Sequence, residues 1–262
     1  MLGRVLAKVA AATPFRIKRS FAWLKPAYLS AIRLGEPVAL VATPAGMLRW
    51  RIDALTSQRY LLGTYEEFMQ QAFLRFVRPG AVVYDIGAHT GFHALFCAQL
   101  VKPGGTVIAF EPDPVARKSL ETQLRENYEL PVKVMGFALS DHCGKVYMDT
   151  SRGTSESKIS EQGNVEVDAN SVDELIAHGR IPPPALLKID VEGHEAAVLR
   201  GARFTLQQYN PVVLCDYNEG DTLGAVTELL LPLGYSISPG PPITALPGAT
   251  DLGGRTCSEF ES

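Results

Sequence analysis

Cysteine is scarce in this chain, and its four copies are too widely spread to form a recognisable motif. Cys97, Cys143, Cys215 and Cys257 include no C-x-x-C pair and have no nearby histidine at a spacing suited to zinc. This pattern argues against a small fold held together by disulfides or zinc, and it favours a reducing, cytoplasmic setting. Cys97 lies in a helical pattern and Cys215 in a strand-like run, so both are expected to be small core residues.

The start of the chain lacks both a long apolar run and acidic residues. Basic side chains interrupt residues 1–35 well before the roughly 18 apolar residues that a membrane-spanning helix needs, and no secretory signal is present. This segment has seven lysines and arginines and no acid, so the formal net charge of −3 leaves −10 for the remainder. The chain therefore has a strong charge asymmetry between its start and its main part.

A basic, amphipathic, acid-free segment has two interpretations. It can form a helix that packs on the rest of the protein with its basic face in solvent, which is the commoner arrangement. It can also lie on the surface of an anionic membrane. The mildly acidic total charge argues against nucleic acid as a partner. We therefore expect a cytoplasmic protein, with peripheral membrane contact through residues 1–35 as the alternative.

Alternating strand and helix patterns occupy most of the 262 residues. Five apolar runs have the length of buried strands, and the apolar-periodic stretches between them are typical of helices. The runs are residues 81–86, 106–110, 132–139, 185–190 and 212–215. This order predicts an α/β fold with a doubly wound, mostly parallel sheet.

The segments on either side of this repeat have other patterns. Residues 38–53 predict a hairpin with a Pro-Gly turn, and Thr64 is the expected N-cap of a helix. The apolar stripe of that helix is Phe68, Ala72, Phe73 and Phe76. From Pro239 onward, proline and glycine are so frequent that we expect an edge strand at most. The expected divisions are a basic helical segment and hairpin (1–54), a cofactor-binding domain (55–238) and a loose tail (239–262).

The first strand of the repeat ends in a glycine turn with the features of a nucleotide cradle. Asp85 is followed by Gly87-Ala88-His89-Thr90-Gly91 and then by a helical pattern. The glycines let the backbone approach a ligand, and the start of a helix presents free N–H donors. Glu111 ends the second strand, twenty residues after Gly91. That is close to the spacing at which an acid accepts hydrogen bonds from ribose hydroxyls.

This arrangement suits both NAD and S-adenosylmethionine, and the turn distinguishes between them. A dinucleotide fingerprint reads G-x-G-x-x-G, whereas this turn has no middle glycine and is preceded by Asp85. An acid at that position would face the cationic amino-acid end of S-adenosylmethionine, directly or through water. The turn therefore favours the sulfonium nucleoside. An NAD-dependent oxidoreductase and a non-catalytic nucleoside-binding scaffold are the alternatives.

Every predicted strand of the repeat ends in polar or acidic side chains. They are Asp85, Glu111, Asp141 next to Ser140, Asp190 with Glu192, and Asp216. The carboxyl ends of parallel strands lie at one edge of a sheet, where α/β proteins bind ligands. Since buried carboxylates are costly without partners, this concentration argues for chemistry and against a scaffold.

Four motifs resemble the FkbM family of S-adenosylmethionine-dependent methyltransferases: Tyr84–Gly91, Phe110–Asp113, Phe137–Asp141 and Leu187–Glu195. The resemblance covers roughly residues 55–219, and Gly63–Glu66 also resembles the segment before that family's domain. It implies a Rossmann-like fold of the class I methyltransferase type. It also implies transfer of a methyl group to an oxygen of a sugar, a glycan or lipid, or a secondary metabolite. His89 departs from the family pattern, in which asparagine is frequent.

The resemblance also implies roles for individual positions. The methionine and ribose side of the cofactor would be bordered by Asp85, Gly87, Ala88, His89 and Gly91. Glu111 would hold the ribose hydroxyls, and Ala138 and Leu139 would border the adenine. Asp190 would end the fourth strand near the sulfonium methyl, with Glu192 and His194 following at the mouth.

Methylation of a hydroxyl also requires a base or a metal to remove its proton, because the pKa of a hydroxyl is high. His194 has a suitable intrinsic pKa, and Asp190 is a second candidate. A further alternative is a divalent cation held by oxygen ligands from Asp190, Glu192 and Asp216. The structural alternative is that Glu192 caps the next helix. Residues 150–164 are expected to shape the acceptor pocket, but their composition does not identify the acceptor.

Overall fold

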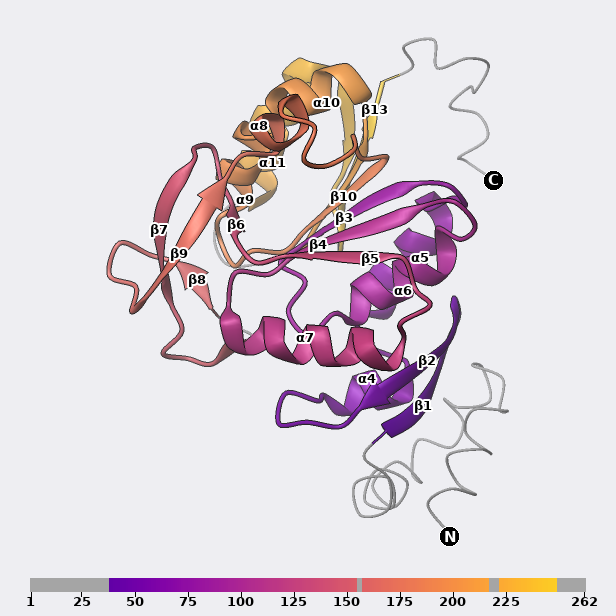
Figure 1. Ribbon diagram of the computed structural model, residues 1–262. Coiled ribbons are helices and arrows are strands. Elements are labelled where there is room, and N and C mark those ends of the chain that lie inside the picture. The colour runs from indigo at the N-terminus through magenta and orange to yellow at the C-terminus, as the bar shows by residue number, and fades with distance from the viewer. Residues whose placement is uncertain (1–37, 155–156, 217–221, 249–262) are drawn as a thin grey trace, which may run out of the picture.

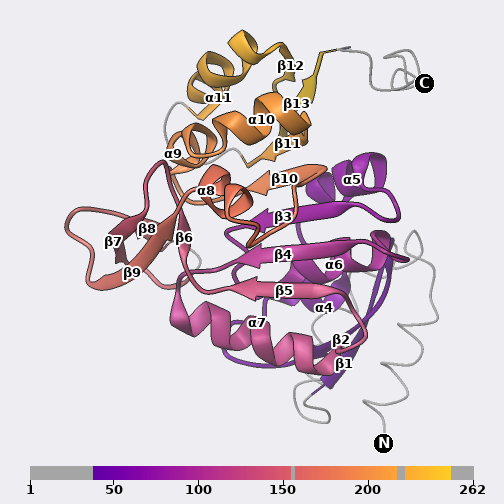
Figure 2. The ribbon, with the colours of Figure 1, turned by 45° about the horizontal axis from the view of Figure 1, so that its top comes forward.

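A central sheet of seven strands organises the computed structural model, which describes residues 38–154, 157–216 and 222–248 (Figure 1). The strands are β3 Val82–Ile86, β4 Thr106–Phe110, β5 Val132–Met135, β10 Leu186–Ile189, β11 Val212–Cys215, β12 Tyr235–Ser238 and β13 Ile243–Pro247. They lie in the order β12-β13-β11-β10-β3-β4-β5 (Figure 2). All five predicted runs contribute strands, so the predicted α/β sheet is confirmed.

The direction of the strands creates a crevice at the centre of the sheet. The strands β11, β10, β3, β4 and β5 pair in parallel, whereas β13 pairs antiparallel with both β11 and β12. From β3 the chain first winds outward through β4 and β5, and later returns to β10 on the other side of β3. In open α/β sheets, ligands bind where the winding direction reverses. This point lies between β3 and β10.

Helices cover both faces of this sheet. They are α5 Glu67–Phe76, α6 Phe92–Leu100, α7 Pro114–Glu126, α8 Val172–Ala177, α9 Glu195–Arg200, α10 Arg203–Tyr209 and α11 Thr222–Leu230, followed by the 3-10 helix η3 Leu231–Leu233. Side chains alternate along each strand, so Val83 packs with α5, α6 and α7 while Tyr84 packs with α8 to α11. Cys97 and Cys215 are buried in these two clusters, as predicted.

The predicted hairpin is also present. Strands β1 (Val38–Thr43) and β2 (Gly46–Arg51) pair antiparallel and lie beside α7 rather than in the main sheet (Figure 1). Asn127 and Gln123, from the end of α7, bond the backbone of β2 with both their carbonyl and amide groups. Trp50 of β2 is fully buried against aromatic rings of the layer beneath it. The hairpin therefore covers the layer formed by α6 and α7.

The third predicted strand, residues 132–139, is wrong as a single element. It breaks at Gly136, and its second part, β6 (Ala138–Leu139), joins a smaller sheet. The other strands of that sheet are β7 Gly144–Asp149, β8 Lys158–Ile159 and β9 Val165–Asn170. The Arg117 guanidinium causes the break, because it donates to the carbonyls of Gly136, Pro112 and Glu111 and fills the space beside Gly136.

The helix expected from Thr64 begins later than predicted. A short helix, α4 (Gln58–Leu62), precedes it and ends at Gly63 with a φ of 66°. The chain then turns, and α5 starts with Glu66 as its N-cap rather than Thr64. Phe68 of the predicted apolar stripe is exposed, while Met69 and Gln70 are buried. Phe73 of the predicted stripe is fully buried, and Ala72 and Phe76 pack against the same core, so the prediction is wrong only for Phe68.

The C-terminal part of the sheet is more ordered than the sequence pattern indicates. Strand β13 lies between β11 and β12, and Ile243 and Ala245 are fully buried, so the prediction of an edge strand at most is wrong. The apolar face of this short strand outweighs its flanking prolines and glycines. The predicted helix within residues 1–35 lies outside the described residues. Within the described ranges, no helix is long and apolar enough to cross a membrane.

Candidate active site

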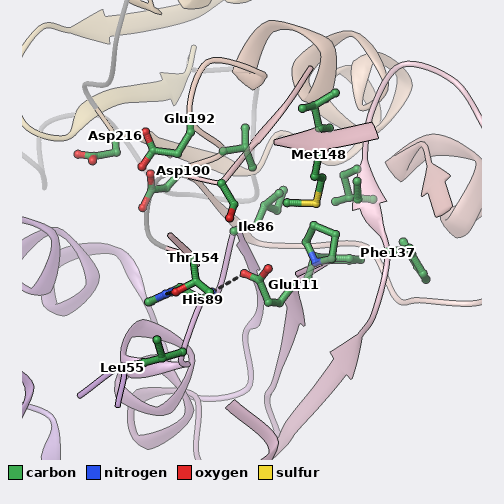
Figure 3. Close-up of a pocket in the computed structure, with 18 of the residues that line it drawn as sticks. Leu55, Ile86, His89, Glu111, Phe137, Met148, Thr154, Asp190, Glu192 and Asp216 are labelled. Carbon is green, nitrogen blue, oxygen red and sulfur yellow. Dashed lines mark hydrogen bonds between the residues drawn. The ribbon is translucent and has the colours of Figure 1, made fainter. Parts of the chain in front are cut away.

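A cavity of about 620 Å³ opens at the carboxyl ends of β3, β4 and β10, at the reversal of winding (Figure 3). Its walls come from five parts of the chain: residues 54–66, the turns after β3 and β4, residues 137–139, the small sheet, and the residues after β10 and β11. Its volume is within the usual range for sites that enclose a small ligand. Seven of the predicted site residues line it: Gly87, His89, Glu111, Ala138, Leu139, Asp190 and Glu192.

The two glycines of the turn are required by the backbone. Gly87 has a φ of 77°, and a Cβ atom there would lie 1.8 Å from the carbonyl oxygen of Asp190. Gly91 has a φ of 88°, and its Cβ would lie 2.2 Å from a methyl carbon of Leu120. The turn therefore packs its backbone directly against β10 and α7. Gly91 is the N-cap of α6, and the buried Ala88 lies between the two glycines.

Glu111 is held at the edge of the cavity by backbone donors. Its Oε2 accepts a hydrogen bond from the backbone N–H of His89 at 2.6 Å, and its Oε1 accepts one from Asp113 at 2.8 Å. Burial raises the pKa of Glu111 to about 7, although these backbone hydrogen bonds lower it. The carboxyl group thus ties the turn after β3 to the turn after β4 and borders the cavity between them.

His89 occupies a left-handed position, with a φ of 49°. Asparagine, aspartate and histidine are the non-glycine residues that accept this conformation most readily, so histidine can stand where asparagine is frequent in the family pattern. The ring Nε2 lies 2.9 Å from the Thr154 hydroxyl, at the tip of the small sheet (Figure 3). Met148, Ser157 and Ile159 of the same region also line the cavity. The small sheet therefore forms one wall of the cavity.

A buried lysine connects the turn to the end of β10. Lys188 Nζ lies 3.1 Å from Asp85 Oδ1 and 3.4 Å from Asp190 Oδ2, and it donates to the carbonyl of Gly87 at 2.9 Å. Burial lowers the pKa of Lys188, but Asp85, Asp190 and Glu66 outweigh this effect and hold the pKa above its ordinary value. Asp85 is 1% exposed and does not line the cavity. Its position is beneath the turn, where it pairs with Lys188.

Acidic side chains gather on the side of the cavity away from Phe137. Asp190, Glu192 and Asp216 lie together there (Figure 3). Glu66 lines the cavity as well. His194 does not line the cavity; its Nε2 lies 3.0 Å from the Ser140 hydroxyl. Among the residues that the structure describes, no three or more His, Cys, Asp or Glu side chains form a group that could hold a metal ion.

Several residues of the site have no role in the sequence-based prediction. Tyr65 and Glu66 line the cavity from Gly63–Glu66, a segment that resembles the region before the family's domain but received no site role, and Tyr60 of α4 lines it too. A signal for Lys188 was present, because a lysine between Leu187 and Ile189 in a buried strand needs a buried partner. The partner, Asp85, lies opposite Lys188 in the neighbouring strand. This pairing is apparent only once the strand order is known.

The residues present fit a nucleoside cofactor with a ribose and no pyrophosphate. Gly87 leaves no room for a side chain, Glu111 supplies acceptor oxygens, and Phe110, Phe137 and Leu139 give one side of the cavity an apolar surface. A doubly wound sheet with this cavity at its reversal point is typical of Rossmann-like enzymes that bind a nucleoside cofactor, a class to which the S-adenosylmethionine-dependent methyltransferases belong. The comparisons with known proteins identify the family within this class.

The chain belongs to the FkbM methyltransferase family, since the model described as "Methyltransferase FkbM domain" matches residues 85–237. The hexuronic acid methyltransferase AglP of Haloferax volcanii is 32% identical over 183 residues, which cover 69% of this chain and 71% of that protein. The 31-O-demethyl-FK506 methyltransferase FkbM of Streptomyces tacrolimicus is 30% identical over 210 residues, covering 66% and 80%. The predicted family and methyltransferase activity are thereby confirmed.

A solved methyltransferase structure agrees with this fold. A precorrin-6y C5,15-methyltransferase from Geobacter metallireducens superposes with a TM-score of 0.50 at 16% identity, covering 74% of this chain and 93% of that one. An FkbM methyltransferase from Methylobacillus flagellatus gives a TM-score of 0.48 at 19% identity and covers 72% of this chain. This chain spans about half, 52%, of that longer protein. The predicted class I methyltransferase fold is confirmed.

Proposed function

We propose that this methyltransferase transfers the methyl group of S-adenosylmethionine to a hydroxyl oxygen of a sugar, a glycan or lipid, or a secondary metabolite. The observation that carries the proposal is the single cavity that joins the Glu111 side to the acidic side at Asp190 and Glu192. The names of two relatives, a hexuronic acid methyltransferase and a 31-O-demethyl-FK506 methyltransferase, support acceptors of this kind. When bound, the cofactor supplies an electrophilic methyl group.

We assign the cofactor to the Glu111 side of the cavity and the acceptor to the acidic side at Asp190 and Glu192. Glu111 accepts hydrogen bonds from the ribose hydroxyls, while Ala138 and Leu139 border the adenine. Asp85 acts indirectly, through Lys188 and the Gly87 carbonyl, and holds the turn in place for the cofactor. Asp190 and Glu192 accept hydrogen bonds from hydroxyls of the acceptor and orient them. Because positioning supplies much of the acceleration in a direct displacement, this orientation is central to the reaction.

Two measurements test the proposed function. Calorimetry with S-adenosylhomocysteine should show binding to the full chain, and absence of binding would contradict the cofactor assignment. Transfer of a labelled methyl group should then be detectable with a panel of methyl glycosides of hexoses and hexuronic acids. The same assay with EDTA added shows whether a divalent cation takes part. Binding without transfer to any glycoside would exclude simple sugars as acceptors.

Substitution of Asp190 by asparagine should lower kcat/KM for the best glycoside of this panel by roughly 30-fold, because a hydrogen bond to a charged carboxylate contributes about 1.5–3 kcal/mol. Affinity for S-adenosylhomocysteine should change less than threefold. His194 does not line the cavity, so His194→Ala should have a smaller effect on kcat/KM. The exposed Glu161, changed to glutamine, is the control. An unchanged kcat/KM in Asp190→Asn would remove Asp190 from the acceptor site.

The proposal includes peripheral contact of residues 1–35 with an anionic membrane surface. This part rests on the segment's net charge of +7, with no acidic residue. Deleting residues 1–35 should reduce sedimentation with anionic liposomes at low salt and leave binding of S-adenosylhomocysteine unchanged. Neutral liposomes are the control, because they should not retain the full chain. Equal sedimentation of the deletion variant and the full chain with anionic liposomes would contradict the contact.

A further inference from the structure

Glu66 is a buried carboxyl group in the wall of the cavity that neither the sequence pattern nor the proposed function uses. Its side chain is 15% exposed, and its Oε2 is buried and has no hydrogen-bond partner among the described residues. The same oxygen lies 3.5 Å from Nε2 of His93, whose side chain is 4% exposed. Leaving such groups unsatisfied is costly, so native structures rarely retain them without a functional reason.

The backbone around Glu66 is held in an uncommon conformation. Glu66 has a φ of 41°, which is unfavourable for a residue other than glycine and recurs at functional sites. Gln70, which is 1% exposed, maintains this turn because its side-chain amide donates to the carbonyl of Tyr65 at 2.6 Å and to that of Gly63 at 3.2 Å. The turn thus fixes Glu66 at the cavity wall before α5 begins.

The groups that face Glu66 come from four elements of the fold. They are Tyr65 beside it, His93 on α6, Lys188 and Asp190 on and after β10, and Asp216 after β11. Burial raises the pKa of Glu66 to about 7; Asp190 and Asp216 add to this effect, whereas Tyr65 and Lys188 oppose it. Burial lowers the pKa of His93 well below its ordinary value, so its ring is neutral. Glu66 therefore changes its charge near neutral pH, as a general base does.

We infer that Glu66 is the catalytic base that takes the proton from the acceptor hydroxyl, with His93 as its positioning residue. This inference rests on the proposed function. The O–H bond of the acceptor breaks and its proton passes to the Glu66 carboxylate. The acceptor oxygen bonds to the methyl carbon as the carbon–sulfur bond breaks, and that electron pair stays on sulfur. Glu66 then returns the proton to water.

Two other carboxylates of the cavity, Glu111 and Asp190, are less suited to this step. Both oxygens of Glu111 already accept backbone hydrogen bonds. Asp190 forms an ion pair with the buried Lys188. Glu66, by contrast, has a buried oxygen without a hydrogen bond next to a neutral imidazole. This difference in partners, rather than the mere presence of an acid, distinguishes Glu66 from Glu111 and Asp190.

The test compares Glu66→Gln with Glu67→Gln, since Glu67 is the next residue and does not line the cavity. The probe is the methyl glycoside that the wild type methylates fastest. In Glu66→Gln, kcat should fall by about 100-fold or more, while affinity for S-adenosylhomocysteine stays within threefold. The wild-type kcat should rise as the pH approaches 7 and level off above it. A fall of less than threefold, or the same pH profile in Glu66→Gln, would overturn the inference.

A second readout needs no acceptor. The folded protein holds the Glu66 proton up to about pH 7, whereas an unfolded chain releases it near the ordinary pKa of 4.5. This contribution to stability is complete below pH 4.5 and is lost as the pH rises to 7. The melting temperature of the wild type should therefore fall relative to that of Glu66→Gln across this range. Parallel curves would overturn the inference, whereas failure of the wild type to bind S-adenosylhomocysteine would instead overturn the proposed function.

Discussion

Replacing Glu111 by glutamine is expected to weaken binding of S-adenosylhomocysteine by roughly 100-fold, which corresponds to about 3 kcal/mol. The carboxylate is proposed to accept hydrogen bonds from the ribose while it already accepts them from the backbone of His89 and Asp113. A glutamine amide replaces one acceptor oxygen with an NH2 group. This NH2 group cannot accept a hydrogen bond. Whether it faces a backbone N–H or a ribose hydroxyl, that donor is left without an acceptor. Calorimetry at pH 8 measures the loss.

The control for this prediction is Glu192→Gln, which makes the same change elsewhere in the cavity wall. Its affinity for S-adenosylhomocysteine should stay within threefold of the wild-type value, because Glu192 is proposed to contact the acceptor. Equal losses in both variants would point to a general effect of removing charge, and would contradict the specific role of Glu111. An unchanged affinity in Glu111→Gln would remove Glu111 from the cofactor site altogether.

The pH dependence of S-adenosylhomocysteine binding is a second test of the role of Glu111. Burial raises the pKa of Glu111 to about 7, so the carboxylate that accepts hydrogen bonds is lost as the pH falls below this value. Wild-type affinity for S-adenosylhomocysteine should therefore decrease from pH 8 to pH 6. In Glu111→Gln this part of the pH dependence should disappear, since glutamine does not titrate.

The parts of the site that lie close together in sequence could be predicted from the sequence. The run from Ala81 to Phe92 contains a strand, a turn and a helix start within twelve residues. Its glycines mark positive φ, and the structure places them where a Cβ would collide with β10 and α7. Glu111 follows the next strand directly. Each of these inferences needed only local spacing and the rule that ligands bind at the carboxyl ends of parallel strands.

The remaining features depend on contacts between residues that are distant in sequence. The strand at residues 132–139 looked continuous, because nothing local shows that the Arg117 guanidinium takes the space beside Gly136. The stretch that forms β13 looked loose, because its burial comes from β11 and β12 on either side. Glu66 is twenty-seven residues from His93 and its turn is maintained by Gln70, so its burial had no local signature.

Replacing Lys188 by methionine is expected to reduce the free energy of unfolding by about 3–5 kcal/mol, measured by urea denaturation. Methionine fills a similar volume but leaves the Asp85 carboxylate, which is 1% exposed, without a cation. The variant also loses the hydrogen bond to the Gly87 carbonyl. A loss of this size is a large fraction of the 5–15 kcal/mol that stabilises a typical domain.

The double variant Asp85→Leu/Lys188→Met distinguishes a buried ion pair from simple packing. When both charges are removed together, the uncompensated carboxylate disappears, so the double variant should be more stable than Lys188→Met alone. Additive losses would contradict the ion pair. Because Lys188 also contacts Asp190 and the Gly87 carbonyl, the double variant should still bind S-adenosylhomocysteine more weakly than the wild type. If the double variant is more stable than Lys188→Met but binds S-adenosylhomocysteine no better, the two roles of Lys188 are separable. One role is to neutralise Asp85, and the other is to hold the turn and Asp190 in position at the cavity.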